Sequence, residues 1–369
     1  MKFSLFFEIP VPRPWDAHSE RRAYHECLQQ AILADRLGFH AVWSVEHHFL
    51  EEFSHCSNPE VLYGAIAART ERLRIGYGVR LLPKPYNHPV RSAESAAVLD
   101  LLSDGRVNFG TGRSASRDEL EGFGIDPHQT REMWQESLGH IVGCWTNDEY
   151  EFEGKHWSMP KRRVLPKPIQ SPHPPIFGAT GSVDGHELVG GMGIGLCSFS
   201  IGTSMHNLEE RVDKYRAAFR RCEKPVGATP NEHVVAFTMV NCAPTKGASY
   251  EASRAAYEWY AKHAVAGAAE FSDWLEERSG DLGTYGYTDR MRAAARSGRA
   301  DVALTFEKMM GNNSVIAGDP DEVIERARQY EAAGVDELLC LFNPYDMPHE
   351  NVMASMRLMG EHVLPEFAG

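Results

Sequence analysis

The choice between an open sheet and a closed barrel depends on a stretch near the start of the chain, Phe3-Ser4-Leu5-Phe6-Phe7-Glu8-Ile9-Pro10-Val11-Pro12. Phe3–Ile9 is an apolar run of the kind that forms a buried strand. An open, doubly wound sheet that binds a dinucleotide has a glycine-rich turn directly after this strand, but here prolines follow and no glycine. The glycine-rich run at 190–195 has the wrong spacing and precedes a strand, so we interpret it as a helix-to-strand turn. The sequence therefore favours a closed barrel.

The alternation of strand and helix continues to the end of the chain. Apolar, β-branched runs predict further strands at 41–45, 73–79, 106–110, 176–180, 195–199, 234–240 and 337–342. Helical patterns follow the strands at about 59–70, 89–102, 128–145, 183–190, 206–222, 248–265 and 348–363. Two further helices are expected: one that has Tyr24 and Ala31 on a single face and ends at Gly38, and one that is capped by Asp319 and ends at Gly334. Alternating strands and helices imply a parallel sheet, and eight repeats predict an α/β fold of the eight-stranded parallel β/α (TIM) barrel type.

Two insertions interrupt the repeat. Residues 147–175 alternate around Gly154 and then become proline-rich, which predicts a small hairpin lying over the barrel and a crossing segment. Residues 266–316 are too long for an ordinary connection, and their glycines beside Tyr285 and Tyr287 predict a mobile lid. Neither insertion has enough apolar material for its own core, so we expect residues 1–369 to form a single domain.

Composition restricts the classes of function. The formal net charge of −13 would repel a phosphate backbone, so nucleic-acid binding is not expected. No segment approaches the roughly 18 apolar residues of a membrane helix, and the N-terminal apolar run is too short for a signal peptide. The seven cysteines lack the spacing of a metal or redox motif and are typical of buried thiols. We therefore expect a cytoplasmic protein with no membrane partner.

Polar residues follow the predicted strands at their C-terminal ends, where a barrel of this kind has its active site. Glu8 ends the first strand, and Glu46-His47-His48 follows the second. His88 lies beyond the third, Arg113 follows the fourth, and Thr180-Gly181-Ser182 ends the fifth. We therefore expect these residues to lie at one rim of the barrel.

The residue types at this rim indicate anion binding and proton transfer. Arg113 can bind an anion through two parallel hydrogen bonds, and Gly181 and Ser182 precede a helix whose first amides can bind the same phosphate. The alternative is a surface ion pair and an ordinary helix cap. His47 beside Glu46 is an acid–base candidate because imidazole titrates near neutral pH. Adjacent histidines lack the spacing of metal ligands on one helix face, so no metal site is expected.

Several motifs occur in the order seen in the bacterial luciferase-like flavin-dependent monooxygenases, and the chain resembles that family over nearly its whole length. They include Phe39-His40-Ala41-Val42-Trp43, Glu46-His47-His48-Phe49, His88-Pro89-Val90-Arg91, Ser103-Asp104-Gly105-Arg106, Gly110-Thr111-Gly112-Arg113, Leu165-Pro166-Lys167-Pro168-Ile169-Gln170 and Gly318-Asp319-Pro320-Asp321-Glu322. The histidine loop is most similar to that of the luciferase α subunits. Those subunits have a reactive cysteine where this chain has Gly112, so light emission is not implied.

The resemblance also assigns roles to residues. It implies a catalytic group of His47, Glu46 and His48, with His47 transferring protons. It implies a substrate pocket that includes Glu8 and His88, although Glu8 can equally face a buried partner. It implies that FMN contacts Gly78 and Val79, which match the position of a non-proline cis peptide bond in the family. The other implied FMN contacts are Arg113, Arg131, Thr180, Gly181, Ser182, Ser198 and Phe199.

The implied activity is that of a two-component monooxygenase. A separate flavin reductase would supply reduced FMN, which with O2 would form a flavin peroxide that oxidises a small organic substrate. Hydride transfer with a deazaflavin coenzyme and a non-catalytic flavin-binding paralogue remain as alternatives. The choice among hydroxylation, aldehyde oxidation and Baeyer–Villiger insertion also stays open. Analogy with the family implies a homodimer, for which Val61, Leu62, Ile66 and Val98 form a candidate face unless they pack on the barrel.

Overall fold

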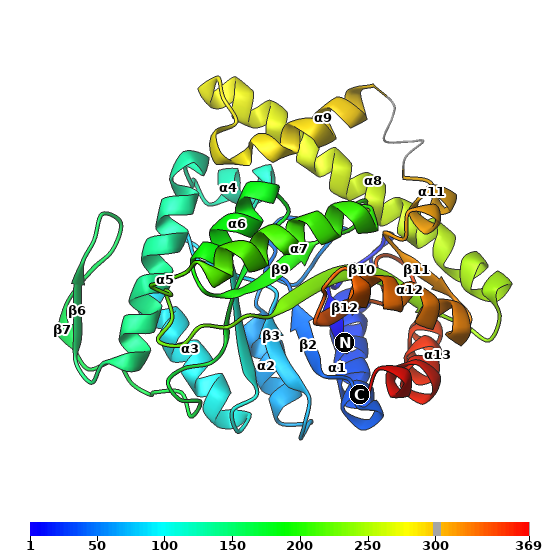
Figure 1. Ribbon diagram of the computed structural model, residues 1–369, viewed down its shortest axis with the longest axis horizontal. Helices are drawn as coiled ribbons and strands as arrows, with labels where there is room; N and C mark the ends of the chain where they lie inside the picture. The colour runs from blue at the N-terminus through cyan, green and yellow to red at the C-terminus, as the bar shows by residue number, and fades with distance from the viewer. Residues whose placement is uncertain (298–303, 369) are drawn as a thin grey trace.

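A closed barrel of parallel strands forms the centre of the computed structural model, which describes residues 1–297 and 304–368 (Figure 1). Around the barrel the strands are β1 (Lys2–Phe7), β2 (Ala41–Ser44), β3 (Arg74–Tyr77), β5 (Val107–Gly112), β8 (Ile176–Thr180), β9 (Gly195–Phe199), β10 (Val234–Cys242) and β12 (Glu337–Leu341). The barrel closes because β12 pairs with both β1 and β10, and β10 also pairs with β9. The predicted eight-stranded parallel barrel is confirmed, and each of its strands overlaps a predicted run.

Two short strands extend this barrel. The strand β4 (Arg80–Leu81) pairs with the end of β5, and β11 (Ile316–Gly318) pairs with the end of β10.

Helices surround the barrel (Figure 1). The longer ones are α1 (Ser19–Leu37), α2 (Pro59–Ala67), α3 (Pro89–Leu102), α5 (Thr130–Thr146), α6 (Val183–Gly191), α7 (Met205–Arg220), α8 (Lys246–Ser279), α12 (Pro320–Ala332) and α13 (His349–Leu358). Shorter helical segments are α4 (Arg117–Gly122), η1 (Pro127–Gln129), η2 (Gly283–Thr288), α9 (Asp289–Arg296), α11 (Phe306–Gly311), η3 (Met359–Val363) and η4 (Leu364–Phe367). These positions agree with the expected helices except that α8 continues well beyond residue 265.

A buried carboxylate joins several strands at the N-terminal end of the barrel. Glu337 on β12 accepts hydrogen bonds from Ser4 Oγ at 2.6 Å and from Trp43 Nε1 at 2.8 Å. The Nε2 atom of His233 lies 3.1 Å from its other oxygen. Trp43 in turn lies against Gly76, where a Cβ atom would come within 2.1 Å of the indole ring. This end of the barrel is therefore a closed polar network with no room for a side chain at position 76.

The first insertion contains the predicted hairpin, formed by β6 (Tyr150–Glu153) and β7 (Ser158–Arg162). The hairpin projects from the side of the molecule beside α5 (Figure 1). Phe152 stacks on His140 of α5 with ring centroids 3.9 Å apart. The expectation that the hairpin lies over the barrel was wrong. It packs instead on the outside of α5, through the contact between Phe152 and His140.

The second insertion, expected at 266–316, is largely helical in its described part. Phe271, Trp274 and Leu275 of α8 form a small separate core with Leu120, Ile125 and Tyr285. This second core explains the length of α8, because the helix has a buried face beyond the barrel. Residues 298–303 of the expected lid lie outside the described residues.

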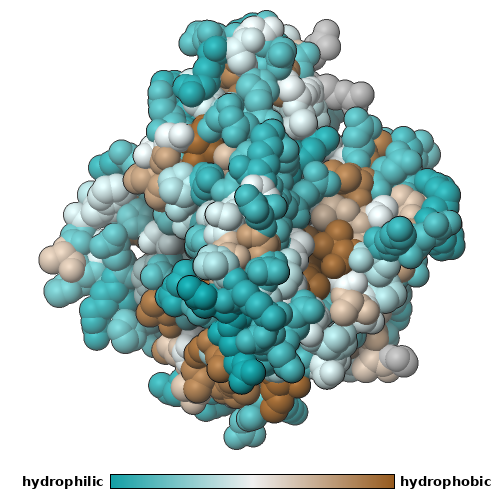
Figure 2. All heavy atoms as spheres, turned by 90° about the vertical axis from the view of Figure 1, so that its left-hand side faces the viewer, coloured by the Kyte–Doolittle hydropathy of each residue, from teal (hydrophilic) through white to brown (hydrophobic). Residues whose placement is uncertain are grey.

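The exposure of the surface residues tests the expected dimer face. Val61 and Val98 are exposed, but Leu62 and Ile66 are buried against the barrel, so half of the predicted face belongs to the core. Figure 2 shows separate hydrophobic patches, divided by hydrophilic residues, on the side toward which the hairpin projects. Among the described helices, none combines the length and apolar character needed to cross a membrane.

Candidate active site

A cavity of about 310 Å³ lies where the barrel strands end. It brings together residues that the sequence places far apart, and most of the predicted site residues line it. These are Glu46, His47, Gly78, Val79, Arg113, Arg131, Thr180, Gly181, Ser182, Ser198 and Phe199. The remaining lining is mainly apolar and includes Phe6, Val45, Trp134, Val235 and Phe237.

The structure corrects the expectation for His88. Its side chain caps α3 by accepting a hydrogen bond from the Val90 amide at 3.2 Å. Its ring lies against Trp157 of the hairpin insertion, with 5.0 Å between the centroids. Since the imidazole is used as a helix cap away from the cavity, His88 is not a pocket residue.

Two arginines make one part of the cavity positive. Arg113 donates to Thr130 Oγ1 at 3.1 Å and to the Thr284 carbonyl oxygen at 3.0 Å, and its guanidinium lies 3.9 Å from the centre of the Tyr285 ring. Arg131 Nη2 lies 3.5 Å from the same carbonyl oxygen. Among the described residues neither guanidinium is paired with a carboxylate. Burial and the neighbouring Arg113 lower the pKa of Arg131, as expected for two cations that share one site.

The helix α6 begins beside these arginines. Ser182 caps it, with Oγ accepting from the Gly185 amide at 3.0 Å. A Cβ atom at Gly185 would come within 1.9 Å of Thr180 Oγ1, so the first turn can approach the end of β8 only with glycine there. The first amides of a helix carry partial positive charge. Together with the two arginines they form a site suited to a phosphate.

The peptide bond between Gly78 and Val79 is cis and lies in the cavity wall. A Cβ atom at Gly78 would lie 2.9 Å from the Phe6 ring, and one at Gly112 would lie 2.5 Å from Val79 Cγ2. A cysteine at 112, as in the luciferase α subunits, would therefore collide with Val79 in this arrangement. The wall at this point is shaped by backbone and small residues.

His47 lies between two buried carboxylates. Its Nδ1 is 2.8 Å from Glu119 Oε1, and its Nε2 is 3.7 Å from Glu8 Oε2. Burial alone would lower the pKa of His47, but the charges of Glu119, Glu8 and Glu46 outweigh it and raise the pKa to about 9. The imidazole is therefore positioned and charged as a proton donor.

Glu119 was not predicted. Besides His47 it accepts from the His48 amide at 3.0 Å and from the Ser114 hydroxyl. Burial opposes its charge, yet these partners hold the pKa of its carboxyl below the usual value. In the sequence it lies in the charged run 117–121, which is typical of a solvated helix, and only its place shortly after a barrel strand pointed to the site.

Glu46 and His48 have different surroundings from His47. Glu46 accepts from the Leu81 amide and from Asn87 Nδ2, both at 2.9 Å, so it joins the loops after β2 and β4. His48 lies outside the cavity lining, stacked on Tyr86 and 3.5 Å from Glu46 Oε1. These contacts suit residues that fix the loop around His47. Glu46 also lines the cavity, whereas His48 does not.

For Glu8, expected to face either the substrate pocket or a buried partner, the structure shows the buried partner. It does not line the cavity that contains His47, and its Oε1 accepts from Tyr260 at 2.9 Å. Directly after it, Ile9 adopts a φ of 57°, a conformation that is costly for a branched residue. Phe49 and Ser114, close to His47 and Arg113, also have positive φ. The ends of three strands are thus held in constrained turns around the site.

Comparisons with known proteins agree with this geometry. The family model for luciferase-like monooxygenases matches residues 1–337. The chain is 31% identical to the oxygenase component of the flavin-dependent trigonelline monooxygenase of Acinetobacter baylyi, over 100% of this chain and 96% of that protein. It is 25% identical to the alkanal monooxygenase alpha chain of Photorhabdus laumondii, over 99% and 97%. The crystal structure of a monooxygenase from Streptomyces bottropensis matches with a TM-score of 0.77 and 26% identity, over 100% of both chains.

Proposed function

Because the chain belongs to the luciferase-like monooxygenase family, we propose that it is the oxygenase component of a two-component system. It would use O2 and reduced FMN from a separate flavin reductase to oxidise a small organic substrate. One observation carries the proposal: a single cavity contains two arginines that have no carboxylate partner among the residues the structure describes, the start of α6 and His47.

The cavity and its lining fit FMN. Arg113, Arg131 and the first amides of α6 provide donors for a phosphate that would otherwise be costly to bury. The backbone of Gly78 and Val79, with apolar side chains such as Phe199, forms walls suited to a flat aromatic ring system. Bound reduced FMN would supply the electrons that activate O2.

The chain's own residues would bind the flavin, orient it and control protons. Glu119 accepts from Nδ1 of His47 and so leaves Nε2 as the nitrogen that gives or takes a proton at the substrate. Tyr287 lines the cavity and Tyr285 covers Arg113, so the segment after α8 limits the access of water. The apolar residues that line the cavity favour an organic substrate that has a hydrophobic part.

A binding experiment tests the cofactor assignment. In Arg113→Ala, loss of a charge-assisted contact costs about 1.5–3 kcal/mol, so FMN should bind roughly tenfold more weakly or worse. Arg117→Ala is the matched control, because Arg117 pairs with Glu121 and Glu270 on the surface outside the cavity. Equal affinity of the Arg113 variant and the control would remove Arg113 from the site. The same titration with a deazaflavin coenzyme separates the two cofactors.

A product experiment tests the reaction. The protein is given reduced FMN, isotopically heavy dioxygen and a panel of organic substrates, and the products are analysed by mass. Monooxygenation predicts one heavy oxygen atom in the product, and His47→Gln should reduce its yield while FMN still binds. Oxidation that proceeds without dioxygen, with a deazaflavin alone, would contradict the proposal.

A further inference from the structure

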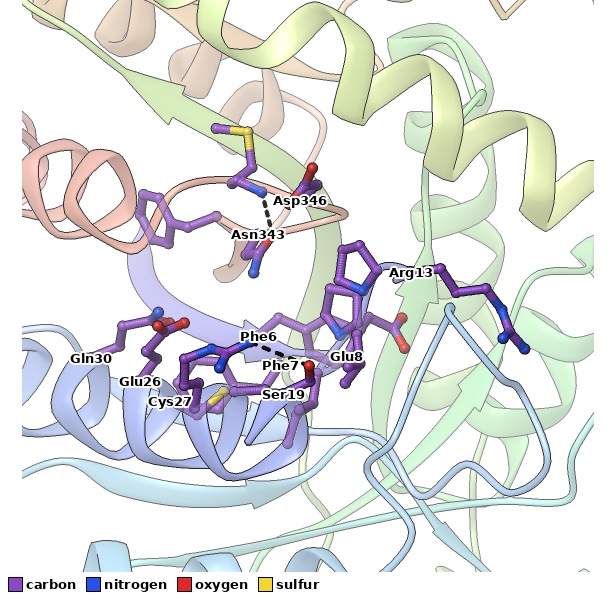
Figure 3. A pocket seen from close by; sticks show the side chains of 18 of the residues that line it. Phe6, Phe7, Glu8, Arg13, Ser19, Glu26, Cys27, Gln30, Asn343 and Asp346 are labelled. Carbon is purple, nitrogen blue, oxygen red and sulfur yellow. Dashed lines mark hydrogen bonds between the residues drawn. The ribbon is translucent and has the colours of Figure 1, made fainter. Parts of the chain in front are cut away.

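A second cavity, of about 360 Å³, lies beside the end of β1 and the first turns of α1, and Glu8 is among the residues that line it. Its lining combines apolar residues with polar and charged ones that include Arg22, Glu26, Gln30 and Asp346. Figure 3 shows Glu8 at the end of its strand beside this cavity. A space of this size and polarity can contain water. Glu8 therefore lies between a polar cavity and the imidazole of His47.

The carboxyl group of Glu8 is buried and only half satisfied. Oε1 accepts from Tyr260 at 2.9 Å, whereas Oε2 has no hydrogen-bond donor within the described part of the chain and lies 3.7 Å from His47 Nε2. A buried, unpartnered polar atom is rare in native proteins. The backbone next to it is fixed, because Ser54 Oγ donates to the Glu8 carbonyl oxygen at 2.5 Å and Ile9 has positive φ. The structure thus aims Oε2 at Nε2 without forming a hydrogen bond between them.

We propose that Glu8 is a proton-relay residue, which resupplies protons to His47 from the second cavity while the first cavity is filled. This inference rests on the proton-transfer role of His47 in the proposed function. A filled, water-excluding active site needs such a route, since solvent can no longer reach Nε2 directly. Glu119 already occupies Nδ1, so among the described side chains that form ion pairs with His47 it is Glu8 that faces the nitrogen that exchanges protons.

The relay is balanced in protons and transfers no electrons. When the Nε2–H bond breaks and its proton passes to a reacting group, a neutral imidazole remains. The Glu8 carboxylate then binds a proton from a hydronium ion that reaches it through the second cavity, and water is left behind. The new Oε2–H bond breaks as the Nε2–H bond of His47 forms, which restores both the imidazolium and the carboxylate. The 3.7 Å separation is longer than a hydrogen bond, but such contacts often shorten when a site is filled.

The charged groups around the pair suit this role. Burial raises the pKa of Glu8 despite the opposing effects of His47 and Tyr260, so it binds a proton more readily than an exposed glutamate. Glu119 on α4 acts on both members of the pair, and Glu46 acts on His47. Burial and the nearby Glu8 raise the pKa of the Tyr260 phenol well above its usual value, so Tyr260 remains a donor to Oε1.

The exchange of the His47 Nε2 proton with water, measured by nuclear magnetic resonance on the full chain with oxidised FMN filling the first cavity, tests the relay. In Glu8→Gln a relay model predicts exchange about tenfold slower or more. A purely electrostatic role predicts the opposite sign, because removing an anion makes the imidazolium more acidic and its proton quicker to leave. Unchanged or faster exchange in Glu8→Gln would therefore overturn the proposal.

Two further variants complete the test. Glu26→Gln removes a carboxylate from the same cavity without facing His47, and it should leave exchange unchanged. Equal slowing in both variants would overturn the assignment to Glu8. If Glu8→Gln does not fold, Glu8→Asp keeps the acid but withdraws it from Nε2, and unchanged or faster exchange would overturn the relay. A separate titration measures FMN binding, so the two failures are distinguishable: absence of binding would reject the proposed function, whereas normal binding with unchanged exchange would reject the relay alone.

Discussion

At the scale of single residues, the charge of His47 affects stability as well as chemistry. Burial would lower its pKa, but the surrounding carboxylates raise it from 6.5 to about 9. A group with a raised pKa in the folded state stabilises the fold fully below about pH 6.5, and this stabilisation is lost as pH rises through about 9.

We therefore expect the free energy of unfolding to fall more steeply between these two pH values in the native protein than in His47→Gln. Denaturant titrations at several pH values measure both curves. Glutamine retains a polar side chain of similar size, so the difference between the curves isolates the titration of the imidazole. Two parallel curves would show that the carboxylates do not raise the pKa of His47.

His47 could be predicted from the sequence, but its partner Glu119 could not. His47, Arg113 and Ser182 could be found because each directly follows a predicted strand in a characteristic motif. Glu119 lies 72 positions from His47 and reaches it only through the turn of α4. His88 was predicted in the substrate pocket, but it does not line the cavity that contains His47. Its contact with Trp157 depends on where the hairpin insertion returns to the barrel, which the sequence does not show.

At the scale of elements, Glu337 joins the strands at the N-terminal end of the barrel. Burial opposes its charge, yet hydrogen bonds and the histidines His233 and His40 lower its pKa to about 2. Removing one partner of a buried charged network typically costs about 3–5 kcal/mol, so Glu337→Gln should lower the free energy of unfolding by that order. Denaturant unfolding measures it, with the exposed Glu361→Gln as control. Equal stability of the two variants would contradict the role of this network.

We propose that the segment from η2 to α9 acts as a lid over the flavin. Its Thr284 carbonyl oxygen now accepts from Arg113, and a bound phosphate would compete for that guanidinium. FMN binding should therefore change the hydrogen exchange of amides in residues 283–297, most simply by slowing it as the segment closes. Mass spectrometry of peptides measures this, with hairpin residues 150–162 as an internal control. Identical exchange with and without FMN would indicate that this segment is a rigid part of the surface and not a lid.

The elements themselves were largely predictable, because buried parallel strands are continuous β-branched runs and the intervening helices have clear boundaries. The second half of α8 was not. The alanines around Gly267 favour a helix but mark no apolar face, so the amphipathic pattern fades there. The buried face beyond it forms because Leu120 and Tyr285 from other segments cover Phe271 and Trp274. The second half of α8 therefore depends on tertiary packing, which a local sequence pattern does not reveal.

At the scale of the whole molecule, we propose a homodimer formed through α2 and α3. The exposed apolar residues on these helices are Val61, Val98, Leu101 and Leu102. Burial of such residues favours association. Light scattering at micromolar concentration should give about twice the 41.3 kDa monomer mass, and introducing charge with Val61→Glu and Leu102→Glu should return the protein to the monomer. A monomeric native protein would contradict the proposal.

For the molecule as a whole, we propose that the barrel places a flavin between the two arginines and His47. A crystal structure of the FMN complex tests it most directly. We predict the phosphate within about 3 Å of Arg113 and of the first amides of α6, with the ring system against the cis bond between Gly78 and Val79. FMN bound outside this cavity, or a phosphate far from Arg113 while Thr284 keeps its contact with the guanidinium, would contradict the account.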